Sequence, residues 1–293
     1  MNRVLELFGV STKTKKRIDW KGVEGKSWCP FLNRMCLKNR KSRPDILIGT
    51  CSVAHGREEQ AIIICPHRLL ERRQIFTDCI HLLSLHEPGN EFHIVPEVPV
   101  PGGSVDYFLV SVNRGKVQDF VGIELQTLDT TGTVWPERQR FLRAVGLAVA
   151  DEDVECKDTF GMNWKMTAKT ILVQLHHKVE TFESINKHFV LVVQTPLVGY
   201  MKENFAFEHV RTARLGDSMH LHGYDLGPTN GEWRIELSSR LSTDATGVGK
   251  LLGLQTSARV ELEAMIALLQ ERISPQTIFE VSTVDVAPPT KPS

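Results

Sequence analysis

The stretch that decides the fold is PGGSVDYFLVSVNRGKVQDFVGIELQ, residues 101–126. Residues 105–112 and 117–126 are rich in Val, Ile, Leu, Phe and Tyr, which favour strands, and the residues between them carry a turn signal. Gly115 can supply the positive φ that a tight turn needs. We therefore predict a β-hairpin with its turn centred on Gly115.

This register places Asp106 directly opposite Glu124. The Cβ atoms of opposed residues lie roughly 4.5–5.5 Å apart, so the two carboxylates repel each other and are costly to bury. A divalent cation between them removes that cost. Gln126 shares the face of Glu124, because side chains alternate along a strand. Two carboxylates and an amide at one point make a candidate Mg²⁺ site for phosphodiester hydrolysis.

The alternative is a hairpin that carries paired polar residues on a solvated face. Two features favour the cation site over it. Phe108, Val110 and Phe120 lie on the same face as the carboxylates, so that face is not simply solvated. Gly122 leaves space beside Glu124, as a site that needs close approach of a backbone or a ligand would.

Composition and charge set the broad class. With 293 residues, 41% hydrophobic and 24% charged, the chain suits a globular protein with one large domain or two smaller ones. The sequence has no run of about 18 apolar residues of the kind that predicts a membrane span, and residues 1–17 lack a secretory signal. We therefore expect a cytoplasmic protein. The formal net charge of zero argues against a surface that is basic throughout, although local patches decide nucleic-acid contact.

Cysteines are concentrated near the N-terminus. Four of the six fall between residues 29 and 65, at Cys29, Cys36, Cys51 and Cys65. Four thiolates suit a tetrahedral Zn²⁺ or Fe site that cross-links a segment with little core of its own. The spacing matches no standard finger, so buried free thiols are the alternative. His55 or His67 could also replace one cysteine ligand.

Basic residues follow two patterns in this region. Residues 1–20 hold a short basic run, which we expect to be a solvated arm or helix end. Five more cations lie within ten positions: Arg34, Lys38, Arg40, Lys41 and Arg43. A metal-fixed loop with these residues suits contact with phosphates, whereas a solvated surface loop explains them equally well.

Apolar periodicity predicts the elements around the hairpin. They are a helix from Pro66 to before Pro88, a strand over 91–100, a helix opened by Pro136 and extending to residue 150, a helix over 163–186 and a buried strand over 188–195. The order of these elements is helix, strand, strand, strand, helix, strand. It indicates an α/β or α+β sandwich, with a mixed central sheet flanked by helices. Later elements are short strands over 218–224 and 232–238 and a helix over 257–272.

The order of these elements resembles the PD-(D/E)XK nuclease fold. Its motif stands here as Gly103-Ser104-Val105-Asp106 and Glu124-Leu125-Gln126, with Gln126 in place of the usual lysine. Together with the four upstream cysteines and the steps Cys29-Pro30 and Cys65-Pro66, the motif is similar to that of the NotI family of type II restriction endonucleases. The resemblance covers roughly residues 25–200.

The resemblance implies a homodimeric endonuclease that makes Mg²⁺-dependent double-strand cuts at a GC-rich palindrome, such as CGGCCG or a longer site that contains it. It implies that Asp106, Glu124 and Gln126 are catalytic. Asp106, Glu124 and the carbonyl of Leu125 would hold Mg²⁺. The four cysteines Cys29, Cys36, Cys51 and Cys65 would bind structural iron, with zinc as the other possibility.

We expect four parts in the chain: a metal-binding, DNA-contacting segment over 1–66, a nuclease core over 67–200, an extension for DNA recognition or dimerisation over 201–281, and a disordered tail over 282–293. Additional metal ligands could come from Glu71, Glu91 or Glu97. Candidates for reading bases are Arg211, Arg214, Asp217 and Asp225, although surface ion pairs explain them as well.

Two other functions fit parts of the pattern. One is a metal-stabilised DNA-binding regulator without catalysis, and the other is a repair nuclease of the same fold without sequence specificity. The opposed Asp106 and Glu124 favour an enzyme, because a binding module has no use for them.

Overall fold

The computed structural model describes residues 2–40, 42–253, 266–267 and 270–271. The chain divides into two compact units, Met1–Leu254 and Gln255–Ser293, and every element described below belongs to the first. The helix predicted over 257–272 falls, apart from four positions, outside the described residues, and the tail over 282–293 falls wholly outside them. No helix in the described part is long and apolar enough to cross a membrane.

A seven-stranded sheet forms the centre of the first unit, in the order β15-β17-β16-β14-β11-β10-β9. Its strands β11, β14 and β16 are parallel neighbours, and its other pairs are antiparallel. The strands are β9 (Glu91–Val100), β10 (Gly103–Asn113), β11 (Lys116–Gln126), β14 (His188–Gln194), β15 (Arg211–Thr212), β16 (Met219–Thr229) and β17 (Glu232–Thr243). The predicted mixed sheet with flanking helices is confirmed, and β16 and β17 are longer than expected.

The predicted hairpin is β10 with β11, and its register is confirmed. Tyr107 lies opposite Ile123 and Leu109 opposite Val121, as a turn centred on Gly115 requires. The register shifts by one residue only near the turn, after Ser111. Continuing the ladder beyond Tyr107 brings Asp106 level with Glu124.

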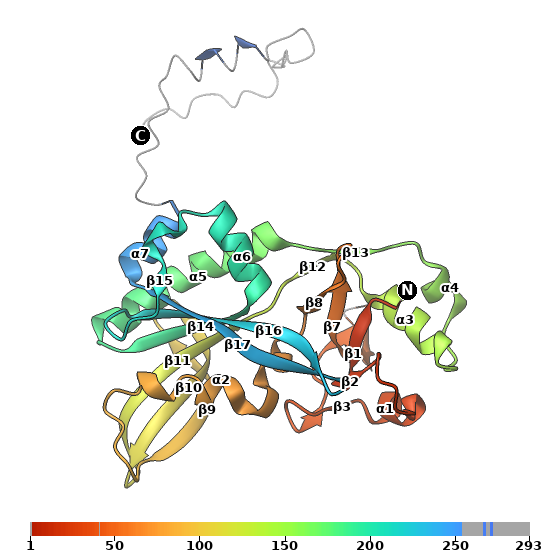
Figure 1. The fold of residues 1–293 in the computed structure, drawn as a ribbon, viewed down its shortest axis with the longest axis horizontal. Helices are drawn as coiled ribbons and strands as arrows, with labels where there is room; N and C mark the ends of the chain where they lie inside the picture. The colour runs from red at the N-terminus through yellow and green to blue at the C-terminus, as the bar shows by residue number, and fades with distance from the viewer. Residues whose placement is uncertain (1, 41, 254–265, 268–269, 272–293) are drawn as a thin grey trace, which may run out of the picture. The chain divides into compact units, whose positions relative to one another are not determined.

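Helices cover both faces of the large sheet (Figure 1). On one face lie α5 (Trp164–Ser184), α6 (Thr195–Asn204) and α7 (Ala245–Leu251). Their apolar side chains share a core with the strand residues Phe108, Val110 and Leu191. On the other face, the segment after Pro66 packs Leu69 and Phe76 against strand residues such as Val121 and Val190. The strand β14 is therefore buried on both faces, as predicted.

Gly122 permits a close approach, as expected, and the group that approaches is a side chain of α5. A Cβ atom at this position would lie 2.4 Å from Cζ of Phe182 on α5 and 3.0 Å from Cδ2 of Phe189. The space that the glycine leaves is thus filled by a core ring and not by a ligand. Gly122 lets α5 approach the hairpin closely, and in this way it sets the position of the helix over the carboxylates.

The prediction of a single long helix after Pro66 is wrong. The segment is a 3₁₀ helix η1 (Pro66–Arg73), a short α2 (Gln74–Thr77) and a second 3₁₀ helix η2 (Ile80–Leu82). Arg72 and Arg73 both adopt a left-handed φ, which ends regular helix there. The carboxylate of Glu71 accepts hydrogen bonds from Arg68, from Arg234 and from the amide of Ile235, and these bonds hold the backbone out of helical register.

The basic residues expected to be solvated near the N-terminus, Lys13, Lys15, Lys16 and Arg17, are exposed, and the residues before them belong to a small antiparallel sheet. Its order is β2-β1-β7-β8, with β1 (Val4–Leu7), β2 (Val10–Ser11), β7 (Thr50–His55) and β8 (Gln60–Ile63). Val4 and Leu7 are fully buried. The side chain of Gln194, at the end of β14, accepts from the amide of Ile63 at 2.8 Å and donates to the carbonyl of Ala61 at 2.6 Å, which joins the two sheets.

The remaining elements lie around the small sheet, except for η3, which packs against α6 and α7. They are α1 (Trp20–Lys26), β3 (Trp28–Cys29), β4 (Arg34–Met35), β5 (Asn39–Arg40), β6 (Arg43–Leu47), β12 (Thr130–Gly132), α3 (Trp135–Ala144), α4 (Asp151–Glu155), β13 (Phe160–Met162) and η3 (Phe207–His209). The helix opened near Pro136 ends at Ala144 and not at residue 150. Gly146 has a φ of +88°, a conformation that a helix cannot continue through.

We predict that Gly122→Ala lowers the free energy of unfolding by about 1–3 kcal/mol, because the new methyl group overpacks the contact with Phe182. Phe182→Leu in the Gly122→Ala background should recover part of that loss, which a double-mutant cycle from urea unfolding measures. Gly199→Ala on α6 is the control, since nothing lies within 4 Å of the added atom. Equal losses in both alanine variants would contradict the proposed contact.

Candidate active site and cysteine cavity

Asp106 and Glu124 lie in a buried setting under α5. Oδ2 of Asp106 accepts a hydrogen bond from the amide of Leu125 at 2.8 Å. Oε1 of Glu124 accepts from Nζ of Lys178 at 2.8 Å, and Oε2 of Glu124 is buried with no hydrogen-bond partner among the described residues. Lys178 is 4% exposed and Glu124 is 8% exposed. One oxygen of a buried carboxylate is therefore available for a cation.

Burial raises the pKa of both carboxyl groups. For Glu124, the charge of Asp106 raises the pKa further, and Lys178 opposes both effects. For Asp106, the amide of Leu125 and the charge of Lys178 oppose the burial, while Glu97 adds to it. A divalent cation would stabilise the ionised form of both carboxyl groups, because its charge offsets their mutual repulsion and the cost of their burial.

The neighbouring residues of the motif take different positions. Leu125 is buried, and the amide of Gln126 donates to the carbonyl of Thr127 at 2.6 Å. Glu97, on β9, has a left-handed φ of 53° and acts electrostatically on Asp106. Glu71 belongs to the ion network around Arg68, and Glu91 pairs with Val112 at the other end of β9. Glu97 is therefore the one of the three expected additional carboxylates that the structure places beside Asp106.

The sequence pattern carries a signal for Lys178 that the hairpin alone does not reveal. Lys178 follows Leu175 by three positions and Ile171 by seven, so it lies on the apolar face of α5. A lysine on the buried face of a helix needs an acidic partner. Which acid this is cannot be read from the local pattern, because Glu124 lies far away in sequence.

The four N-terminal cysteines line one small cavity, although they come from separate elements. Cys29, Cys36, Cys51 and Cys65 surround it together with His67, in a space of about 10 Å³. All four are buried free thiols, and burial raises the pKa of Cys29, Cys51 and Cys65. The space is about that of a single small atom or water. No three of the described cysteine sulfurs lie within 4.8 Å of one another, so an ion would require them to move closer.

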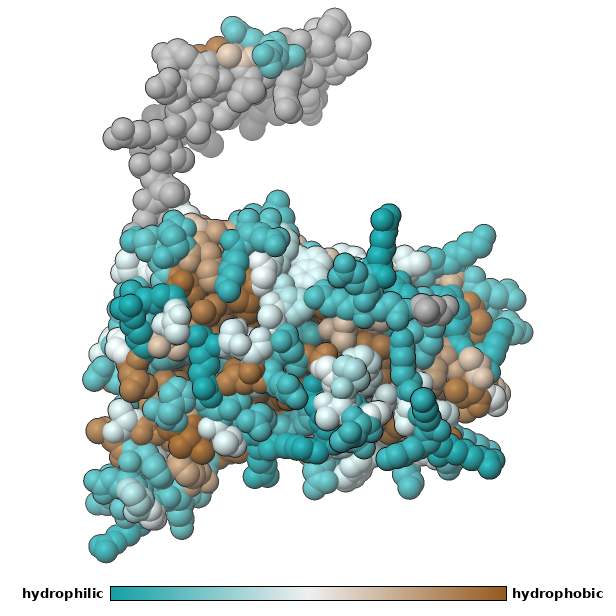
Figure 2. All heavy atoms as spheres, in the orientation of Figure 1, coloured by the Kyte–Doolittle hydropathy of each residue, from teal (hydrophilic) through white to brown (hydrophobic). Residues whose placement is uncertain are grey.

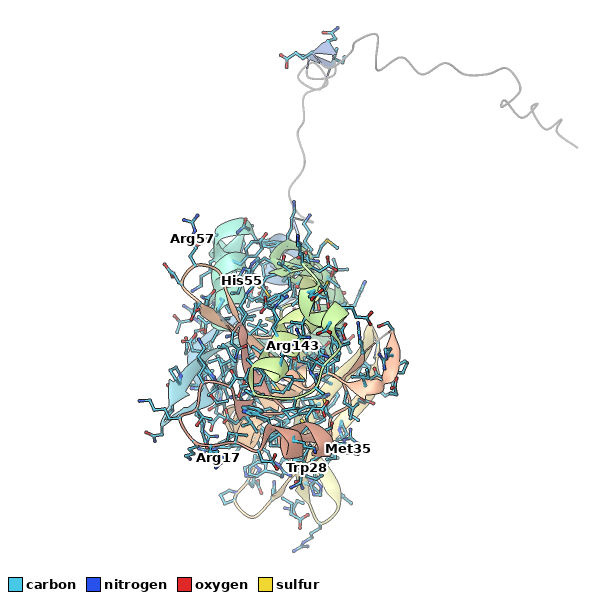
Figure 3. The ribbon with its side chains drawn as sticks, turned by 90° about the vertical axis from the view of Figure 1, so that its right-hand side faces the viewer. Arg17, Trp28, Met35, His55, Arg57 and Arg143 are labelled. Carbon is cyan, nitrogen blue, oxygen red and sulfur yellow. The ribbon has the colours of Figure 1, made fainter. Side chains whose placement is uncertain are left out.

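Asp106 acts electrostatically on His67 at the cysteine cavity. His67, which lines the cavity, has its pKa lowered by burial and by Arg34, while Asp106 raises it. On the outside of the cavity, the β3–β4 hairpin pairs Trp28 with Met35, and both side chains are exposed (Figure 3). The cavity therefore lies between a surface hairpin and the catalytic candidates.

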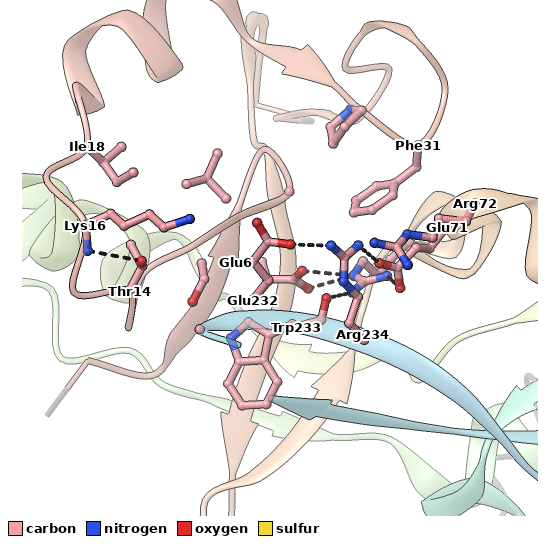
Figure 4. A pocket seen from close by; sticks show the side chains of 16 residues that line it. Glu6, Thr14, Lys16, Ile18, Phe31, Glu71, Arg72, Glu232, Trp233 and Arg234 are labelled. Carbon is pink, nitrogen blue, oxygen red and sulfur yellow. Dashed lines mark hydrogen bonds and ion pairs between the residues drawn. The ribbon is translucent and has the colours of Figure 1, made fainter. Parts of the chain in front are cut away.

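A second cavity, of about 320 Å³, lies between the N-terminal strands and β17 (Figure 4). Arg68 donates to Glu6 at 2.9 Å, to Glu71 at 2.9 Å and to the carbonyl of Trp233 at 2.8 Å. Arg234 also pairs with Glu71. Each buried charge in this network is matched, so we interpret it as a structural clamp between the two sheets.

Two of the four candidates for base reading pair with each other, whereas Arg214 and Asp225 are exposed. Arg211 pairs with Asp217, which is buried and also accepts from Oγ of Ser242. Asp225 is exposed on β16. Elsewhere in the described part, His176, His177 and Glu180 on α5 are the one group whose three ligand atoms lie within 4.8 Å of one another.

The family model described as "Restriction endonuclease NotI" matches residues 24–216, which is more than half of the chain of 293 residues. The matched range includes the four cysteines of the cavity, the hairpin and Lys178. A search of curated proteins gave no match.

We predict that the purified chain contains about one tightly held Fe or Zn ion, which elemental analysis measures. Cys36→Ser should remove the ion and lower the melting temperature, because the cavity loses one of four soft ligands. Cys156→Ser is the control, since Cys156 is a half-buried thiol outside the cavity and should leave the metal content unchanged. A folded native protein without bound metal would contradict the prediction.

Proposed function

The chain belongs to the NotI family of restriction endonucleases, and from that premise we propose that it makes Mg²⁺-dependent double-strand cuts at a GC-rich palindromic DNA site. CGGCCG, or a longer site that contains it, is the proposed target. We further propose that the core is of the PD-(D/E)XK type, with Asp106 and Glu124 as its acidic residues.

The observation that carries this proposal is the opposition of Asp106 and Glu124 under α5. Glu124 is buried and Asp106 is half-buried, both have a raised pKa, and Oε2 of Glu124 has no partner among the described residues. In a protein that only binds DNA, such a pair lowers the free energy of unfolding and has no functional role. An enzyme needs it to hold a hard divalent cation against the scissile phosphate.

The residues present fit Mg²⁺, which prefers carboxylate and carbonyl oxygens. Asp106, Glu124 and the carbonyl of Leu125 would hold it. When bound, the ion polarises the phosphoryl oxygen and lowers the pKa of the attacking water. The chain's own contribution is to orient the two carboxylates, through the amide of Leu125 and the ammonium of Lys178. Gln126 can only hydrogen-bond, because it has no charge to give.

A groove that shares Lys38 and Thr50 with the cysteine cavity supports a path for DNA. It has a volume of about 770 Å³ and lies between residues 37–40 and residues 130–135. Lys38 and Arg40 line one side, and Thr130 and Thr133 line the other. Figure 2 shows hydrophilic side chains projecting from the right-hand half of the visible face, where the N-terminal strands and α3 lie. Cations and hydroxyl groups are the usual ligands of DNA phosphates.

We propose that the four expected parts divide the work of the enzyme. Residues 1–66 would contact DNA, with Cys29, Cys36, Cys51 and Cys65 holding iron or zinc to fix the segment. Residues 67–200 would cut, and residues 201–281 would read DNA or form the dimer, ahead of the tail over 282–293. A twofold homodimer suits a palindrome, because each subunit then meets the same half-site.

We predict that the purified chain, incubated with long mixed-sequence DNA and Mg²⁺, produces discrete fragments whose sequenced ends share one palindrome. Asp106→Asn and Glu124→Gln should each reduce cleavage by at least about 1000-fold while DNA binding in a gel-shift assay persists. These substitutions keep the shape of the side chain and remove its charge.

Glu91→Gln provides the matched control, because Glu91 lies at the opposite end of β9 and should leave cleavage unchanged. Uncut DNA with the native chain would favour a regulator, and fragments with random ends would favour a repair nuclease. Full cleavage by both charge-removing variants would exclude the assigned site.

A further inference from the structure

Lys178 is an exception on its helix. The other lysines of α5, Lys165 and Lys169, are exposed, whereas Lys178 is 4% exposed and faces the strands. Burying an ammonium group without a partner is costly. Nζ of Lys178 lies 2.8 Å from Oε1 of Glu124, so the acidic residue at the end of β11 is its partner. The pair links a helix to a strand that lies far away in sequence.

The bend before β10 is what allows α5 to come this close. Gly102 has a φ of +92°, and a Cβ atom there would lie 2.9 Å from Cβ of His177 and 3.2 Å from the amide nitrogen of Lys178. Any side chain at position 102 would therefore push the helix away from the hairpin. Gly102 and Gly122 both permit close approach of α5, and between them they fix the height of Lys178 above Glu124.

The ion pair leaves Glu124 with two unequal oxygens. Oε1 is taken by Lys178, while Oε2 is buried and has no hydrogen-bond partner in the described part of the chain. An ionised carboxylate with one oxygen held and the other free is prepared to accept a cation in a fixed direction. A structural ion pair would have no reason to leave the second oxygen without a partner.

We propose that Lys178 is the positioning residue of this nuclease site, which orients Glu124 and supplies from α5 the positive charge that Gln126 lacks on β11. The inference rests on the proposed function. Gln126 cannot take this role, because it is uncharged and its amide donates to the carbonyl of Thr127.

The groups around Glu124 come from separate elements. Lys178 from α5 holds Oε1 at 2.8 Å, and Asp106 from β10 acts on Glu124 electrostatically. Asp106 in turn faces Glu97 from β9 and His67 from η1. Without Lys178, Oε1 loses its ion-pair partner and the carboxylate is free to turn, so the site holds Mg²⁺ more weakly.

The test compares kcat of the native chain and of Lys178→Met at neutral pH, with Mg²⁺ and a DNA that carries the site. We expect kcat to fall by about 10–100-fold, the usual cost of removing a residue that orients a metal ligand. Lys178→Arg keeps the charge and should keep most of the native activity. Gln126→Lys added to Lys178→Met should recover part of the activity.

A second readout does not depend on cleavage. Isothermal titration of the DNA-free protein with Mg²⁺ should show that Lys178→Met binds Mg²⁺ about 10–100-fold more weakly than the native chain does. Lys187→Met is the matched control, because Lys187 pairs with Asp119 at 2.6 Å near the other end of β11. It should cost stability and leave Mg²⁺ binding and cleavage unchanged.

The outcomes separate this inference from the proposed function. Native protein that does not cut DNA with Mg²⁺ rejects the function. Native protein that cuts, together with a Lys178→Met variant of unchanged kcat and unchanged Mg²⁺ titration, overturns the role of Lys178 alone. Equal losses of activity in Lys178→Arg and in Lys178→Met would also overturn it.

Discussion

Repulsion between Asp106 and Glu124 is the constraint on which the candidate site depends. Two carboxylates that face each other across a hairpin are costly to bury, and burial raises the pKa of both. Lys178 neutralises one oxygen of Glu124, and Oε2 remains without a partner among the described residues. Apolar residues at the same positions would make a more stable hairpin. The retained charge is explained if the pair holds a cation during phosphodiester hydrolysis, as membership of a restriction endonuclease family implies.

Segments from the whole first unit hold the pair in place. The helix α5 approaches the hairpin because Gly122 makes room for Phe182 and Gly102 makes room for the backbone of the helix. The small N-terminal sheet is joined to the end of β14 through Gln194 and to β17 through Arg68. The cysteine cavity is thereby held close enough for Asp106 to act on the pKa of His67.

The sequence predicts local features well and distant partnerships poorly. The hairpin register, α5 and β14 follow from alternation and periodicity, which depend on near neighbours. The helix predicted after Pro66 failed because Glu71 bonds to Arg234 and to Ile235, far along the chain. Likewise, Asp106 and Glu124 could be paired from the turn alone, whereas Lys178 could be assigned to Glu124 only once α5 was placed over β11. The hairpin pattern indicates that something approaches Gly122 closely. It does not identify Phe182 as that neighbour, because Phe182 comes from α5.

A crystal of the native chain soaked in Mn²⁺, which substitutes for Mg²⁺ and gives an anomalous signal, tests the central claim most directly. The account predicts an anomalous peak between Asp106 and Oε2 of Glu124, with Lys178 still on Oε1. A peak confined to the exposed group of His176, His177 and Glu180, with the space between Asp106 and Glu124 empty at saturating Mn²⁺, would contradict it.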